Sequence, residues 1–63
     1  MRIKEAVELL GGPTAVANEL KVNRRTVTEW GDKNKVGDRS ILGFINLCKK
    51  YGVKISIYEV SGK

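Results

Sequence analysis

The sequence predicts a small, mainly α-helical domain of three to four helices, followed by one β-strand near the C-terminus. Three observations predict this fold class. Apolar residues recur at helical spacing in several segments before residue 52. Glycine and proline stand between these segments, where helices end or begin. Residues 53–60 are rich in β-branched and aromatic side chains and alternate as a strand does. With 63 residues, the chain is long enough for one domain, 1–63.

The first two helices are predicted over about residues 2–10 and 13–20. The apolar stripe of the first helix consists of Ile3, Ala6, Val7 and Leu10. The helix should end at Gly11 and Gly12, because a left-handed C-cap residue is easily adopted by glycine. Pro13 then begins the second helix at its first position, where a missing N–H does no harm.

A third helix is predicted over about residues 24–32, with Asn23 as its N-cap. The apolar positions of the second and third helices and of their connection are Val16, Ala17, Leu20, Val22, Val27 and Trp30. Two short helices with an apolar residue in a tight connection are typical of a helix-turn-helix, whose second helix enters the DNA major groove. We therefore expect a helix-turn-helix over residues 13–32, with Trp30 in the core.

Residues 31–40 are polar and predict a loop, and a fourth helix should span about residues 41–51, with Asp38 or Ser40 as its cap. Cys48 is expected to be a small buried residue. The apolar face of the fourth helix is wider than one small core requires, so another surface should cover it. A lone strand at 53–60 would leave its backbone groups unpaired, which predicts antiparallel pairing with a second copy. The predicted homodimer contacts are Val53, Ile55, Ile57 and Tyr58.

Composition limits the classes of function. The chain contains no His and one Cys, so a metal site or an internal disulfide is not expected. Because it also lacks a nucleophile–base pair, we expect neither an enzyme nor a cofactor. The start of the sequence has no long apolar run, which predicts no signal peptide, no membrane span and a cytoplasmic location.

Charge placement favours a polyanionic partner. The net charge is +5, and residues 21–40 carry six basic and three acidic side chains. Such a surface attracts phosphate regardless of base sequence, although it also serves simply as a solubilising surface. Lys33, Lys35 and Arg39 follow the third helix in this segment and are predicted phosphate contacts, with ordinary solvation as the alternative.

The outer face of the third helix carries the predicted base contacts. With Val27 and Trp30 pointing inward, a rotation of 100° per residue places Arg25 almost opposite them. Thr28 and Glu29 flank Arg25, and Arg24 lies at the edge of the same face. Arg bonds guanine O6 and N7 as a bidentate pair, Glu accepts from cytosine N4, and Thr contacts a thymine methyl or a phosphate. The alternative is an Arg25–Glu29 ion pair on a solvated face.

Further phosphate contacts are predicted near the base-contact residues of the third helix. Thr14 and the N–H groups that begin the second helix are placed for the DNA backbone, and Thr26 is a further phosphate contact.

Residues 13–32 resemble the helix-turn-helix of the phage repressor and Cro family. The matching positions are Ala17, Leu20, Val22, Val27 and Trp30. The resemblance implies base contact from Arg24, Arg25 and Glu29, with Thr28 close by. It also implies capping or phosphate contact from Asn23. Lys21 stands where the family usually has Gly in the turn, and a non-Gly residue is strained but tolerated there. A short chain with a C-terminal strand also resembles the smallest Cro-type repressors, which dimerise through that strand.

The sequence thus predicts a transcriptional regulator of phage or mobile-element type, a repressor that binds an inverted-repeat operator in double-stranded DNA as a homodimer. One alternative is a protein-binding module, such as an antitoxin or host-factor inhibitor, that uses the apolar face of the fourth helix. A second alternative is an architectural protein that binds DNA without regard to sequence.

Overall fold

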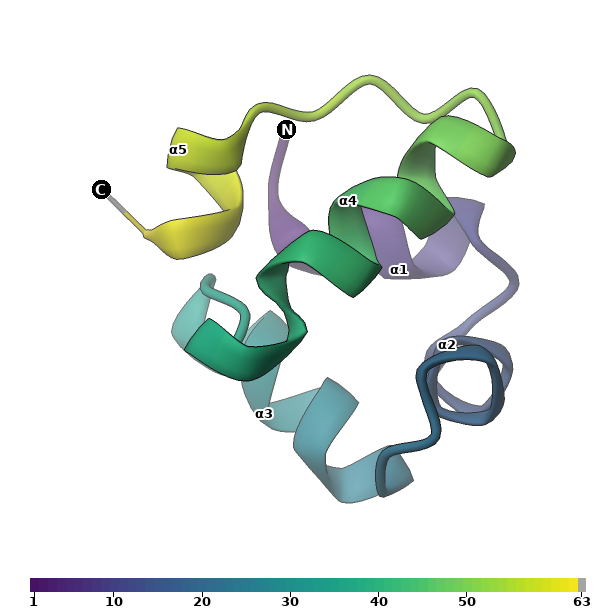
Figure 1. The fold of residues 1–63 in the computed structure, drawn as a ribbon. Helices are drawn as coiled ribbons and strands as arrows, with labels where there is room; N and C mark the ends of the chain where they lie inside the picture. Colours follow the sequence, from purple (N-terminus) through teal and green to yellow (C-terminus); the bar gives the residue numbers. More distant parts are fainter. Residues whose placement is uncertain (63) are drawn as a thin grey trace.

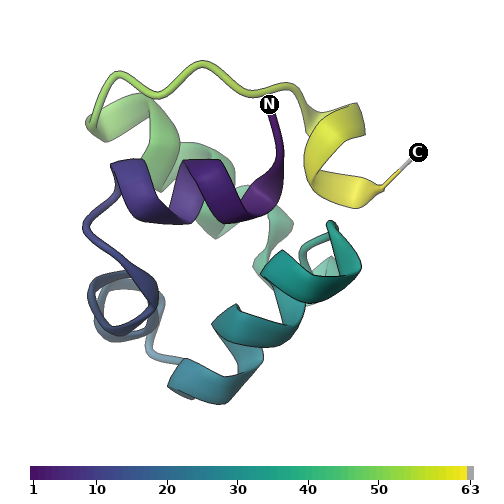
Figure 2. The ribbon, with the colours of Figure 1, turned by 180° about the vertical axis from the view of Figure 1, so that it is seen from behind.

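A computed structural model describes residues 1–62 as a mainly helical domain that measures 23 × 23 × 19 Å. Its elements are α1 (Ile3–Leu9), α2 (Pro13–Leu20), α3 (Arg24–Lys33), the 3-10 helix η1 (Asp38–Ser40), α4 (Ile41–Lys50) and α5 (Ile57–Ser61). In Figure 1, α4 lies in front of α1, and α2 and α3 lie below them. Figure 2 shows from behind that α5 lies near the N-terminus, away from α2. The predicted helical class is therefore confirmed.

The connection between α1 and α2 follows the predicted glycine pair. Gly11 and Gly12 have φ values of 107° and 98°, a region that side chains with a Cβ rarely adopt. The Gly12 N–H donates to the Val7 carbonyl at 2.9 Å and so closes the end of α1. Pro13 occupies the first turn of α2 as predicted. Because both glycines allow a sharp change of direction, α2 turns away from the axis of α1.

Residues 21–23 join α2 to α3. Lys21 takes the left-handed conformation (φ 56°, ψ 44°), and the Val22 N–H donates to the Ala17 carbonyl at 3.0 Å. The turn thus has a left-handed lysine at the position where the resemblance stated above implies glycine. The Asn23 side chain accepts from the Arg25 N–H at 3.1 Å, which confirms Asn23 as the N-cap of α3.

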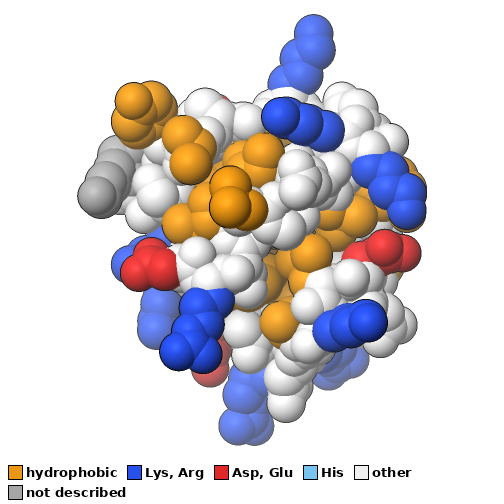
Figure 3. Space-filling view, in the orientation of Figure 1, with side chains coloured by type: hydrophobic (Ala, Val, Ile, Leu, Met, Phe, Trp, Pro, Cys, Tyr) orange, Lys and Arg blue, Asp and Glu red, His pale blue; other side chains and the backbone are white. Residues whose placement is uncertain are grey.

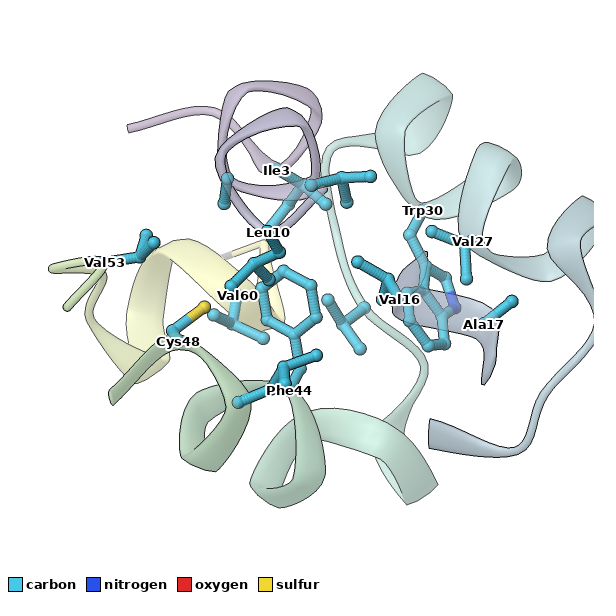
Figure 4. Close-up of a cluster of buried hydrophobic side chains, with 14 residues drawn as sticks. Ile3, Leu10, Val16, Ala17, Val27, Trp30, Phe44, Cys48, Val53 and Val60 are labelled. Atoms are coloured by element: carbon cyan, nitrogen blue, oxygen red, sulfur yellow. The ribbon is translucent and has the colours of Figure 1, made fainter. Parts of the chain in front are cut away.

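The core lies between the helices and also takes side chains from the connecting segments (Figure 4). The Trp30 and Phe44 rings meet edge to face, with centroids 6.1 Å apart and planes at 87°. Trp30 and Cys48 are both buried, as predicted. Burial raises the pKa of the Cys48 thiol, because desolvation disfavours the thiolate.

The predicted strand over residues 53–60 is wrong: in residues 1–62 the structure contains no strand, and α5 occupies Ile57–Ser61. The Ser56 hydroxyl accepts from the Glu59 N–H, and the Glu59 carboxylate accepts from the Ser56 N–H, each at 3.2 Å. This capping box is a helix-start signal that the alternating pattern concealed.

Without this strand, the predicted dimer contacts lie in other surroundings than expected. Val53 is buried in the core of its own chain, and Ile55 packs against that core, so neither is available for pairing with a second copy. Ile57 and Tyr58 remain 50% and 70% exposed. An unpaired strand therefore no longer supports a dimer.

The segment before α4 is polar in composition, but it contributes a buried side chain to the core. Val36 is fully buried, and its N–H donates to the Val60 carbonyl of α5 at 2.7 Å. In residues 1–62, neither Asp38 nor Ser40 forms the predicted side-chain cap of the helix start. A backbone hydrogen bond to the C-terminal helix thus holds this loop.

The wide apolar face of α4 is only partly covered. Phe44, Leu47 and Cys48 point into the core. Leu42 and Tyr51 remain 72% and 51% exposed. None of the described helices has the length and apolar character required to cross a membrane.

Candidate functional site

The beginning of α3 brings four predicted contact residues together. Asn23, Arg24, Arg25 and Thr28 line one hollow of about 330 Å³ at the surface. All four side chains are exposed. The Asn23 cap fixes the first turn of α3, and both arginines extend from that turn. The local sequence therefore places two guanidinium groups at the same exposed helix end.

Neither guanidinium group has an acidic partner in the part of the chain that the structure describes. The ion pair found in residues 1–62 joins the Met1 amino group to Glu59. The alternative Arg25–Glu29 ion pair is thus not formed. Two positively charged groups at a helix N-terminus oppose the helix dipole. Because no acidic side chain of the described residues pairs with them, the guanidinium N–H groups can bind phosphate oxygens, carboxylates or the acceptor edge of a guanine.

Thr28 differs from its neighbours because its hydroxyl is already used. The Oγ1 atom donates to the Arg24 carbonyl at 3.2 Å, one turn earlier in α3. Glu29 follows it on the exposed side of the helix, whereas Thr26 is half-buried. The predicted base-contact residues therefore share one exposed side of α3, and Thr26 is less accessible than they are.

The start of α2 approaches the middle of α3. Pro13 and Thr28 line a second hollow of about 140 Å³, whose apolar wall includes Val7 and Val27. Thr14 follows Pro13 and is exposed. The predicted phosphate contact at Thr14 thus lies at the edge of the α3 surface.

The same hollow contains residues that the sequence interpretation missed. They are Lys4, Glu8, Gly31 and Asp32. No local pattern could have indicated them, because they come from the first helix and the end of the third. Their mixed charges do not extend the basic surface of α3.

The remaining predicted phosphate contacts lie elsewhere. Lys33 and Lys35 line a hollow at the C-terminal end of α3, together with Met1, Tyr58 and Glu59. Arg39 is exposed on η1. A rise of 1.5 Å per residue separates the two ends of α3 by about 14 Å. The lysines are therefore apart from the arginines, at and just beyond the opposite end of the helix.

No group of three His, Cys, Asp or Glu side chains within residues 1–62 is arranged to hold a metal ion. Comparison with protein-family models, with curated proteins and with solved structures finds no match for this chain. A functional assignment therefore depends on the geometry and charge of the α3 surface.

Proposed function

We propose that this protein binds double-stranded DNA in a sequence-specific manner, with α3 in the major groove, and acts as a transcriptional repressor. One observation carries the proposal. Asn23, Arg24, Arg25 and Thr28 meet in one exposed hollow at the start of α3, and the arginines have no acidic partner in residues 1–62. Paired, exposed guanidinium groups at a helix tip suit the acceptor edge of guanine.

The arrangement of α2 and α3 supports the same function. Lys21 adopts the left-handed conformation that a helix-turn-helix requires at the turn. In this proposal, Thr14 at the start of α2 bonds a phosphate beside the groove, and Lys33 and Lys35 contact phosphates near the other end of α3. Arg39 and Asn23 supply further phosphate contacts in this proposal, whereas half-buried Thr26 has a minor role. No catalytic step, cofactor or metal forms part of it.

The proposal includes a homodimer, because one short helix reads too few base pairs to define an operator. Apolar side chains gather over α4 and the segment that leads to α5, with Lys and Arg around the rim (Figure 3). Leu42 on α4 and Ile57 and Tyr58 on α5 are large hydrophobic residues that remain 72%, 50% and 70% exposed. In this proposal they supply the contact between two copies, in place of the strand.

Selection of binding sites from a random pool of duplex DNA tests the proposal. We expect an inverted repeat, with half-sites centred about 10 base pairs apart and at least one G·C pair in each that cannot be replaced. Equal affinity for selected and scrambled DNA would instead identify an architectural binder, and no affinity for either would reject DNA binding.

A matched pair of variants shows whether α3 is the binding surface. The double substitution Arg24→Ala with Arg25→Ala removes two positive charges from the hollow. Lys49→Ala with Lys54→Ala removes the same charge from exposed positions around Val53. We expect the first variant to lose the selected site and the second to retain it. Equal losses would mean that net charge alone drives binding.

A protein-binding module remains a second candidate, because Leu42 is 72% exposed on α4. Sedimentation of the wild type and of Leu42→Glu separates the two functions. A wild-type dimer that becomes a monomer and loses operator affinity supports the DNA-binding dimer. A wild-type monomer with no affinity for DNA, and Leu42→Glu behaving alike, favours the module.

A further inference from the structure

The hydroxyl group of Thr28 is engaged within α3. Its Oγ1 donates to the Arg24 carbonyl at 3.2 Å, although the side chain as a whole is exposed beside Arg24 and Arg25. A hydroxyl has one hydrogen, so Thr28 cannot donate a second hydrogen bond while this one persists. Its oxygen is still able to accept.

This bond limits what Thr28 can recognise. Phosphate oxygens, guanine O6 and N7, and thymine O4 are acceptors and need a donor. Two kinds of groove contact remain: an amino group of adenine or cytosine that donates to Oγ1, and the thymine methyl, which packs against apolar atoms. The oxygen is directed toward the backbone of the preceding turn, so the Cγ2 methyl is the part of the side chain left to meet a partner.

We propose that Thr28 is a specificity-determining residue that selects thymine by contact between its Cγ2 methyl and the 5-methyl group of the base. This inference depends on the proposed DNA-binding function. The selected thymine lies next to the base pair that Arg24 or Arg25 contacts, because the three side chains share one hollow. Thr28 would thus make an apolar contact with a base, whereas the neighbouring arginines would make hydrogen bonds.

Substitution of deoxyuridine for thymine removes only the 5-methyl group and so tests the contact. The probe is a duplex selected by the wild-type protein, prepared with each thymine in turn replaced by deoxyuridine. We expect one position in each half-site at which the replacement weakens wild-type binding about fourfold, the factor that corresponds to about 0.8 kcal/mol for one buried methyl group.

Two variants of Thr28 separate its methyl from its hydroxyl. Thr28→Ser keeps the hydroxyl and its bond to the Arg24 carbonyl but lacks Cγ2. It should bind the thymine duplex about fourfold more weakly than the wild type, and deoxyuridine should cause no further loss. Thr28→Val keeps a methyl in place of the hydroxyl and should remain sensitive to deoxyuridine. Leu9→Val removes one carbon from an exposed side chain on α1, outside the proposed DNA contacts, and should leave the deoxyuridine profile as in the wild type.

The outcomes distinguish this inference from the proposed function. If no DNA is selected, the proposed function fails. If DNA is selected but no thymine is sensitive, or if Thr28→Ser keeps the sensitivity, methyl recognition is wrong while DNA binding stands. Weaker binding by Thr28→Val but not by Thr28→Ser, with no thymine sensitive to deoxyuridine, would assign the Thr28 hydroxyl to an amino group of adenine or cytosine and overturn the methyl contact.

Discussion

The two ends of α3 are held in different ways. At the N-terminal end, Arg24 and Arg25 are exposed, and the local support is the hydrogen bond from the Arg25 N–H to the Asn23 side chain. At the C-terminal end, Trp30 packs on Phe44, and the Asn34 side chain accepts from the Ile3 N–H at 3.0 Å. One end therefore presents charge to the solvent, and the other is bound to distant parts of the chain.

The difference shows how a domain of 63 residues can carry an unfavourable surface group. Arginines at a helix N-terminus cost up to about 1 kcal/mol through the helix dipole. The buried aromatic pair and the contacts at the opposite end offset that cost. Stability and the proposed recognition are thus separated along ten residues of one helix. Substitutions at the C-terminal end should therefore lower stability, whereas substitutions at the N-terminal end should weaken DNA binding with little change in stability.

Trp30→Ala should have the largest effect. Removal of this buried ring leaves a cavity beside Phe44 and should lower the free energy of unfolding by about 3–5 kcal/mol. For a domain of this size that is much of the total stability, and the variant should be largely unfolded at 37 °C. Circular dichroism during heating measures the effect. A melting temperature within a few degrees of the wild type would contradict the view that this end anchors α3.

Arg25→Ala tests the exposed end. We expect a loss of about 1–3 kcal/mol in binding to the selected site and relaxed preference at one base pair. Stability should stay within about 0.5 kcal/mol of the wild type, because the side chain is exposed. Lys35→Ala serves as the comparison and should weaken selected and scrambled DNA alike, with a salt dependence lower by about one unit. Identical behaviour of the two variants on selected and scrambled DNA would mean that α3 does not recognise the base sequence.

The two left-handed residues that flank α3 allow a sharper comparison. Lys21 and Asn34 both have a φ of 56°. Lys21→Gly should raise the free energy of unfolding by about 0.5–1 kcal/mol, because glycine relieves the backbone strain. Asn34→Gly gains less relief, because Asn tolerates the left-handed conformation, and it also loses the hydrogen bond from the Ile3 N–H, worth about 1 kcal/mol. Denaturant unfolding should therefore show a gain for the first variant and none for the second. An equal gain would mean that the Asn34 bond contributes nothing.

Glu59 should give the smallest effect, which is present at neutral pH and disappears at low pH. The hydrogen bond from the Met1 amino group and the Ser56 N–H lower the pKa of Glu59 from its usual value of 4.5. A lowered folded-state pKa stabilises the fold fully above the unfolded pKa, and this contribution disappears as the pH falls through the folded pKa. Thermal unfolding of the wild type and of Glu59→Gln should therefore differ at pH 7 and converge toward pH 3. A constant difference would argue against this linkage.

The bounds of α1 to α4 could be predicted because each depends on local signals. Gly11 and Gly12 end one helix, Pro13 begins the next, and Asn23 caps the third. The exposed face of α3 was also predictable, since the positions of Val27 and Trp30 fix which residues point outward. The site at the start of α3 follows from these local rules.

The C-terminal segment could not be predicted by the same means. Residues 53–60 satisfy a strand pattern, yet Ser56 and Glu59 also form a capping box. The burial of Val60 against its own chain favours the helix, and burial depends on tertiary packing. Val36 is similar. Its side chain is buried and its N–H donates to the Val60 carbonyl of α5, and no local pattern indicates either contact. The hollow that Lys35 shares with Tyr58 and Glu59 likewise depends on the position of α5.

The pairing of the Met1 amino group with Glu59 has a practical consequence. It places the beginning of the described chain beside α5, at the end of the molecule away from the connection of α2 with α3 (Figures 1 and 2). A fluorescent protein or affinity tag fused before Met1 would emerge on this side, clear of Arg24 and Arg25. The fusion would convert the charged amine into an amide and remove its ion pair with Glu59. A reporter at this position should therefore leave the arginine hollow open while reducing the acid sensitivity of the domain.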